Sequence, residues 1–278
     1  MSGIETPRPR IAPSAVVRQG LASTVAGFDA LLRIGWFPAL LLTAAGALME
    51  PDAPYLDAEG TIVITPRATM ILVLMALMAT ALTAMVATAW QREMLQPDAR
   101  ATRRWHFRLG RRELFYMLVA FFLMGLVFMG MATAPGAFQA LQSGNPLGAV
   151  IMMIGPFAAI LVVSRSVMVL PSIALDRGGD IAQVWRAAEG NTLRIAIALF
   201  LGVLPMIAGE LLMLEMAAAV MASDLGLLAE LVLRFVKALM SFVLAVPVVA
   251  VTGVLYALLV DPGLQGALSR PREAFFRS

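Results

Sequence analysis

The chain has 278 residues, of which 60% are hydrophobic and only 14% are charged. A soluble domain averages about 45–50% apolar and about 25% charged residues, so the composition excludes two ordinary soluble domains and indicates a membrane protein that crosses the bilayer several times. The sequence has no cysteine and one histidine, which excludes disulfides, cysteine nucleophiles and most zinc sites. The formal charge is +3. In a membrane protein such a basic balance indicates loops that face anionic lipid headgroups rather than nucleic acid.

The chain begins with a segment rich in arginine and proline, residues 1–22, which predicts a disordered cytoplasmic tail that leads into an interfacial helix. Six apolar segments then approach the roughly 20 residues that a membrane-spanning helix needs. They are Ile34–Met49, Ala68–Trp90, Leu114–Ala134, Pro146–Leu170, Thr192–Met213 and Met240–Val260. The first is long enough only if it extends back towards residue 22. We therefore predict an all-α bundle with six transmembrane helices in one membrane domain, residues 23–261, followed by a second cytoplasmic tail, 262–278.

Basic residues alternate between successive loops. All but three of the 21 Lys and Arg residues lie before the first span, between the second and third, between the fourth and fifth, or after the sixth. The other loops hold only Arg67, Arg234 and Lys237. Because basic loops stay in the cytoplasm, this pattern predicts that both termini and the arginine-rich loops are cytoplasmic.

The loop between the second and third spans is the most basic, and its residues 102–113 read TRRWHFRLGRRE. Arginine interleaved with aromatic residues can grip either nucleic-acid phosphates or lipid headgroups. The neighbouring spans favour lipid. The predicted headgroup contacts are Arg103, Arg104, Trp105, Arg108, Arg111 and Arg112.

Between the fourth and fifth spans, the segment from Asp180 to Gly190 predicts a short amphipathic helix at the cytoplasmic surface. Asp180 can cap its N-terminus, and Gly190 can end it. The apolar face is spaced at i, i+3, i+4 and i+7 and consists of Ile181, Val184, Trp185 and Ala188. We interpret the helix as a connector with its apolar face in the membrane interface, with docking of a partner or lipid sensing as the alternative.

Prolines lie close to the middle of the fourth, fifth and sixth spans, at Pro156, Pro205 and Pro247. A proline frees a backbone carbonyl and kinks a helix, and broken helices form the midplane sites of many transporters. No polar cluster accompanies these prolines, so we interpret them as packing kinks. Gly155 precedes Pro156, which makes the fourth span the best candidate for a hinge.

Ionisable residues are absent from the middle of each predicted span, and Glu210 is expected near the outer end of the fifth. This distribution counts against a proton-coupled transporter, an ion pump and an intramembrane aspartic protease. Lys237 and Ser241 are four residues apart and form the one candidate nucleophilic dyad. No P-loop or hydrolase nucleophile motif occurs.

The segment SRSVMVLPSIALDRGGDIAQVWRAAEGN resembles a pattern in uncharacterised six-span bacterial inner-membrane proteins, which are loosely similar to the membrane domain of some glycerophosphodiester phosphodiesterases. Its landmarks are Arg165, Pro171, Asp176, Trp185, Gly190 and Asn191, together with Trp90-Gln91-Arg92 and Gly110-Arg111-Arg112-Glu113. The resemblance implies a fold and a location. It implies no reaction, because the catalytic residues of those phosphodiesterases belong to a separate soluble barrel.

The sequence favours a non-enzymatic inner-membrane protein that acts as a scaffold, as an accessory subunit or in envelope maintenance. We expect it to contact anionic headgroups on the cytoplasmic side and a membrane-protein partner or a second copy of itself, with no cofactor, metal or nucleic acid. The alternatives are a passive permease or lipid-handling protein that uses the proline-kinked spans four to six, and an intramembrane enzyme.

Overall fold

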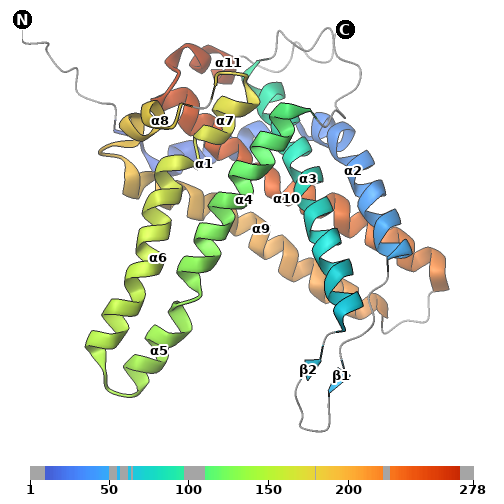
Figure 1. Cartoon of the computed structure of the whole chain (residues 1–278). Helices are drawn as coiled ribbons and strands as arrows, with labels where there is room; N and C mark the ends of the chain where they lie inside the picture. Colours follow the sequence, from blue (N-terminus) through green and yellow to red (C-terminus); the bar gives the residue numbers. More distant parts are fainter. Residues whose placement is uncertain are drawn as a thin grey trace, which may run out of the picture.

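The computed structural model describes residues 10–49, 55–56, 62–63, 65–96, 110–178, 180–221 and 226–269. Six helical segments of the described chain are long and apolar enough to cross a membrane, which confirms the predicted all-α bundle (Figure 1). They are α2 (Phe28–Leu48), α3 (Pro66–Leu95), α4 (Arg111–Met131) continued by α5 (Ala134–Gln142), α6 (Pro146–Ser166) continued by α7 (Val169–Ala174), α9 (Thr192–Met221) and α10 (Gly226–Leu259). A two-residue antiparallel ladder, β1 (Tyr55–Leu56) with β2 (Ile62–Val63), lies between α2 and α3.

The longest helix, α10, forms the centre of the bundle. In its most apolar stretch 61% of the residues are buried, against 17–33% in the other spans. It runs obliquely through the middle of the molecule and packs against α9, α2, α3 and the N-terminal helix α1 (Pro13–Ala26) (Figure 1). Small side chains allow these helices to approach closely. A Cβ atom on Gly20 of α1, for example, would lie 3.0 Å from Cγ2 of Val251.

Helix α1 corrects the predicted N-terminal tail from residue 13 onward. Its buried face consists of Val16, Gly20 and Thr24, which are spaced four residues apart and face α10. The sequence predicted an interfacial helix after the tail but not its start at residue 13 or its packing on α10, because two of the three buried residues are glycine and threonine and the face carries no apolar stripe. Residues 1–9 of the predicted tail lie outside the described residues.

Helices α4, α5 and α6 form an arm that diverges from α2, α3, α9 and α10 (Figure 1). Helices α4 and α5 both pack on α6, and the closest approach is at Gly130, where a Cβ atom would lie 2.6 Å from the Cβ of Ala159. Large apolar side chains cover the outside of the arm, such as Phe122 at 64% exposure and Phe128 at 69%. Such surfaces are stable in hydrocarbon, which is consistent with the membrane assignment.

The opposite end of the arm belongs to a region that we call the charged end of the bundle. It contains α1, α7, the short helix α8 (Ile181–Ala188), and the C-terminal turns η2 (Pro262–Leu264) and α11 (Gln265–Ser269) (Figure 1). The first and last described helices therefore lie at the same end, as six spans require. Within the predicted tail 262–278, residues 262–269 are helical turns that contact α10 and α3.

Candidate functional site at the charged end

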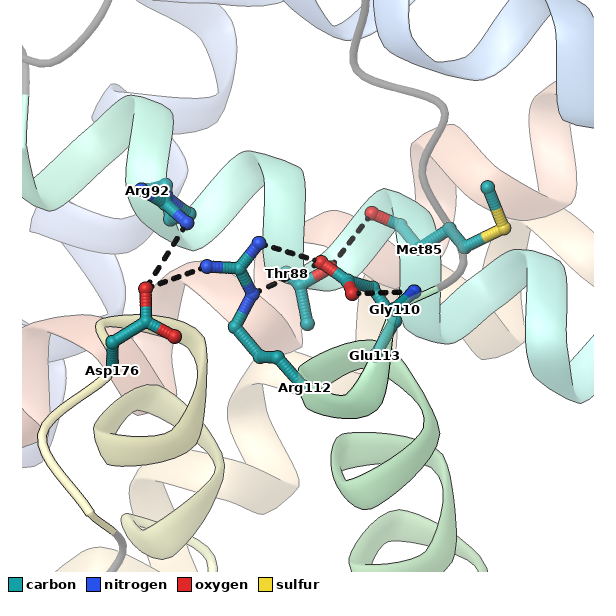
Figure 2. Close-up of polar contacts among 7 residues, drawn as sticks. All are labelled: Met85, Thr88, Arg92, Gly110, Arg112, Glu113 and Asp176. Carbon is teal, nitrogen blue, oxygen red and sulfur yellow. Dashed lines mark hydrogen bonds and ion pairs between the residues drawn. The ribbon is translucent and has the colours of Figure 1, made fainter.

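Four charged side chains from three different parts of the chain meet at the charged end (Figure 2). Arg112 of α4 lies between two carboxylates: its Nη2 is 2.8 Å from Oε1 of Glu113, and its Nη1 is 2.7 Å from Oδ2 of Asp176. Arg92 of α3 approaches the same oxygen of Asp176 at 3.4 Å. We call these four residues the charged clamp, because they join α3, α4 and the turn after α7.

The local backbone places each carboxylate of the clamp. Glu113 is the third residue of α4, and its Oε2 accepts the backbone N–H of Gly110 at 3.0 Å, which satisfies one of the free donors at the start of the helix. Asp176 follows α7 and has a φ of +58°, a left-handed conformation that aspartate adopts more readily than most residues. This turn ends α7 and directs the chain towards α8.

A second ion pair lies next to the clamp. Arg177, the neighbour of Asp176, pairs with Asp261 at the end of α10. The turn after α7 is therefore connected to α3 and α4 on one side and to α10 on the other. These contacts hold the arm to the rest of the bundle at the charged end.

The clamp joins helices through paired charges. Its charges compensate one another, and the side chains of Arg112 and Glu113 are only 17% and 8% exposed. Among the described residues, no three His, Cys, Asp or Glu side chains gather in a group that could hold a metal ion. The ion pairs therefore hold α3, α4 and the turn after α7 in fixed positions relative to one another.

The structure separates the two arginines that begin α4. Arg111 is exposed, whereas Arg112 is turned towards the clamp and occupied by carboxylates. Of the predicted headgroup contacts in the described chain, Arg111 is exposed and Arg112 is mostly engaged in ion pairs. The other four predicted contacts, Arg103, Arg104, Trp105 and Arg108, lie outside the described residues.

The amphipathic helix predicted between the fourth and fifth spans is present as α8. Oδ1 of Asp180 accepts the backbone N–H groups of Ala182 at 2.9 Å and Gln183 at 3.2 Å, so the predicted N-cap is confirmed. Three of the four predicted apolar-face residues turn towards the protein, while the fourth, Ile181, is 58% exposed. The three are Val184 and Ala188, which are buried, and Trp185, which is half-buried.

Trp185 anchors α8 to α6. Its indole Nε1 donates a hydrogen bond of 3.0 Å to Oγ of Ser166, and the guanidinium of Arg165 lies 5.5 Å from the centre of its ring. Nε of Arg165 also donates to Oγ1 of Thr192 at the start of α9, at 3.0 Å. The landmark residues Arg165 and Trp185 therefore hold α6, α8 and α9 together.

The three predicted kink prolines lie within helices that continue past them. Pro156 in α6 and Pro247 in α10 are buried, and Pro205 in α9 is half-buried. A proline cannot donate to the carbonyl four residues earlier, which in α6 is that of Met152. The hydroxyl of Thr133, between α4 and α5, lies 2.8 Å from that carbonyl and donates to it or to Gly130. The arm therefore offers a hydroxyl donor to the carbonyl beside the Gly155–Pro156 step, shared with the carbonyl of Gly130.

A polar pair inside the bundle differs from the sequence-based expectation. Oγ of Ser241 donates to Oε1 of Glu210 at 2.7 Å, between α9 and α10. Both helices extend beyond the predicted spans, and Glu210 lies in the second half of α9. Ser241 is thus engaged with Glu210 rather than with Lys237, whose side chain is exposed. The arrangement of the predicted dyad is not that of an activated nucleophile.

Comparison of the chain with family models, with curated proteins and with solved structures finds no match. The resemblance to six-span inner-membrane proteins therefore stays a prediction. Several of its landmark residues do make contacts between helices, and among them Asp176 belongs to the charged clamp.

Proposed function

We propose that this chain is a non-enzymatic multi-pass protein of a bacterial inner membrane that acts as a scaffold, as an accessory subunit or in envelope maintenance. The observation that carries the proposal is the charged clamp. Its ionisable side chains neutralise one another across α3, α4 and the turn after α7, and Arg112 with Glu113 is mostly buried. A reactive group needs access to a substrate, whereas these charges are used to fix helices.

The distribution of charge supports contact with anionic lipid on the cytoplasmic side. In the sequence, 18 of the 21 Lys and Arg residues lie on the side predicted to be cytoplasmic, and only Arg67, Arg234 and Lys237 lie on the other side. Anionic lipids attract basic residues at the cytoplasmic surface with about 1 kcal/mol for each Lys or Arg. Exposed Arg111 and the basic loop before it supply this charge next to a spanning helix.

The lipid contact is tested with two double variants that remove the same charge from the two predicted sides. Arg104→Gln with Arg111→Gln acts on the basic segment that precedes and begins α4, and Arg67→Gln with Lys237→Gln acts on residues of the loops predicted to face the other side. The retention of phosphatidylglycerol relative to phosphatidylcholine is measured by native mass spectrometry in a neutral detergent. We expect the first double variant to lose the preference for phosphatidylglycerol and the second to keep it. Equal behaviour of the two would contradict the proposal.

The scaffold role is tested by native mass spectrometry of the tagged protein after gentle extraction from its own membrane. A stoichiometric protein partner is expected. A chain that carries only lipid would favour the lipid-handling alternative instead. A reporter fused to the C-terminus, which is active only in the cytoplasm, tests the orientation.

A further inference from the structure

Arg165 is one of the arginines at the charged end that pair with no carboxylate among the described residues; Arg186 and Arg194 bond to backbone carbonyls instead. Arg92, Arg112 and Arg177 each pair with a carboxylate. In the described part of the chain, no carboxylate pairs with Arg165, although its side chain is half-buried at the junction of α6, α8 and α9. Leaving a partly buried charge without a counter-ion costs free energy, so this position favours an anion from outside the chain.

The surroundings hold the guanidinium of Arg165 in one orientation. Nε donates to Oγ1 of Thr192, and the guanidinium lies over the ring of Trp185, which is itself fixed by its bond to Ser166. One of the five N–H donors of the group is thus used within the protein, while those on Nη1 and Nη2 donate to no described residue. A guanidinium that is already oriented binds an anion with two parallel hydrogen bonds at a smaller entropic cost.

The residues next to Arg165 indicate which anion fits. Leu161 and Phe157 precede it by four and eight residues on α6, and their side chains are 51% and 61% exposed. Residues four apart lie along one side of a helix, so an apolar strip ends at a cation near the end of a spanning helix. A phospholipid has the matching order, with acyl chains beside the apolar strip and a phosphate at the level of the arginine.

We propose that Arg165, stacked on Trp185 at the junction of α6, α8 and α9, binds the phosphate of an anionic phospholipid whose acyl chain lies along Leu161 and Phe157. This site rests on the proposed contact with anionic lipid and deepens it. It assigns one bound lipid to a structured site, whereas the basic loop before α4 attracts lipid through its net charge.

The test compares Arg165→Gln with Arg186→Gln in the full chain. Arg186 is a suitable control because it is exposed on α8, carries the same charge, and bonds only to the carbonyl of Ala182 among the described residues. Binding of phosphatidylglycerol to the purified protein in neutral detergent is titrated by native mass spectrometry, with phosphatidylcholine as the reference lipid. We expect Arg165→Gln to lower the affinity for phosphatidylglycerol about tenfold, the effect of one charged hydrogen bond, and Arg186→Gln to leave it unchanged.

A third variant, Arg165→Lys, keeps the charge and removes the planar fork. It should bind phosphatidylglycerol more weakly than the original chain and more tightly than Arg165→Gln. If Arg165→Gln does not fold, an unchanged affinity of Arg165→Lys overturns the proposal. Equal losses in the Arg165 and Arg186 variants would also overturn it, because they indicate unspecific attraction. Displacement of the lipid by inorganic phosphate at equal concentration would show a site for free phosphate and not for a lipid.

The outcomes separate this site from the broader proposal. If the original chain shows no preference for phosphatidylglycerol over phosphatidylcholine, the proposed lipid contact fails together with the site. If the original chain and Arg165→Gln share the same preference, only the site at Arg165 is wrong.

Discussion

Replacing Glu113 by glutamine should destabilise the bundle by about 2 kcal/mol. Two N–H groups of Arg112, Nε and Nη2, donate to Oε1 of Glu113 at 2.9 and 2.8 Å. A hydrogen bond to a charged group contributes about 1.5–3 kcal/mol and a neutral one about 0.5–1.5, so loss of the charge removes about 1 kcal/mol from each bond. Both side chains are mostly buried, which limits screening by solvent. Glutamine can still accept the N–H of Gly110, so the start of α4 is expected to persist.

The assay is thermal unfolding of the purified protein in a fixed neutral detergent. For a chain of this size, a loss of about 2 kcal/mol corresponds to a Tm lower by about 4 °C. Arg111→Gln is the matched control, because Arg111 is exposed and should change stability by less than about 0.5 kcal/mol.

A double-mutant cycle with Arg112→Gln decides whether the pair itself is responsible. If Arg112 and Glu113 stabilise each other, the double variant should lose clearly less stability than the sum of the two single variants. Additive losses, within about 0.5 kcal/mol, would refute the reasoning, because they would mean that the two residues act independently.

Three further predictions concern the arm and α8. Thr133→Val should destabilise the protein by about 1 kcal/mol, because the Met152 carbonyl freed by Pro156 loses its hydroxyl donor. In a Pro156→Ala background a backbone N–H replaces that donor, so the loss should vanish; thermal melts of the original protein, both single variants and the double variant check this. Gly130→Ala should loosen the contact between α4 and α6 and lower Tm. The control Gly125→Ala should leave Tm unchanged or raise it, because no atom lies within 4 Å of the new Cβ; an equal decrease of Tm in both variants would count against the close contact. Asp180→Ala should cost α8 about 1 kcal/mol through loss of its cap, seen as faster hydrogen exchange in α8, and Asp180→Ser should restore the protection.

The six spans were predictable because each depends on local composition. About 20 apolar residues are needed to cross the hydrocarbon whatever the tertiary structure is, and all six segments were found. Their ends were less predictable. Helix α10 begins at Gly226, whereas the predicted span begins at Met240. The prediction missed the first turns because they carry Arg234 and Lys237, which composition assigned to a loop. Arg234 is accommodated in the helix by a bond to Glu230 one turn earlier and by another to the carbonyl of Gly46.

The N-cap of α8 was also predictable, since Asp180 acts on N–H groups two and three residues away. The orientation of its apolar face was only partly predictable. Helical spacing placed Ile181 with Val184, Trp185 and Ala188, yet Ile181 is exposed, because the contact with α6 covers only part of that face.

The class of the protein, the number of its spans and the separation of basic from other loops follow from local composition, because each depends on the transfer of side chains between water and lipid. Which charges have partners depends instead on how the helices pack. Arg111, Arg112 and Arg165 are the same residue type at the end of an apolar span, but their environments differ. Arg111 is exposed, Arg112 lies between two carboxylates, and Arg165 is held against Trp185 with no acidic partner among the described residues. Asp176 and Trp185 lie far along the sequence from Arg112 and Arg165, and such contacts depend on distances of a few ångströms that local pattern does not encode.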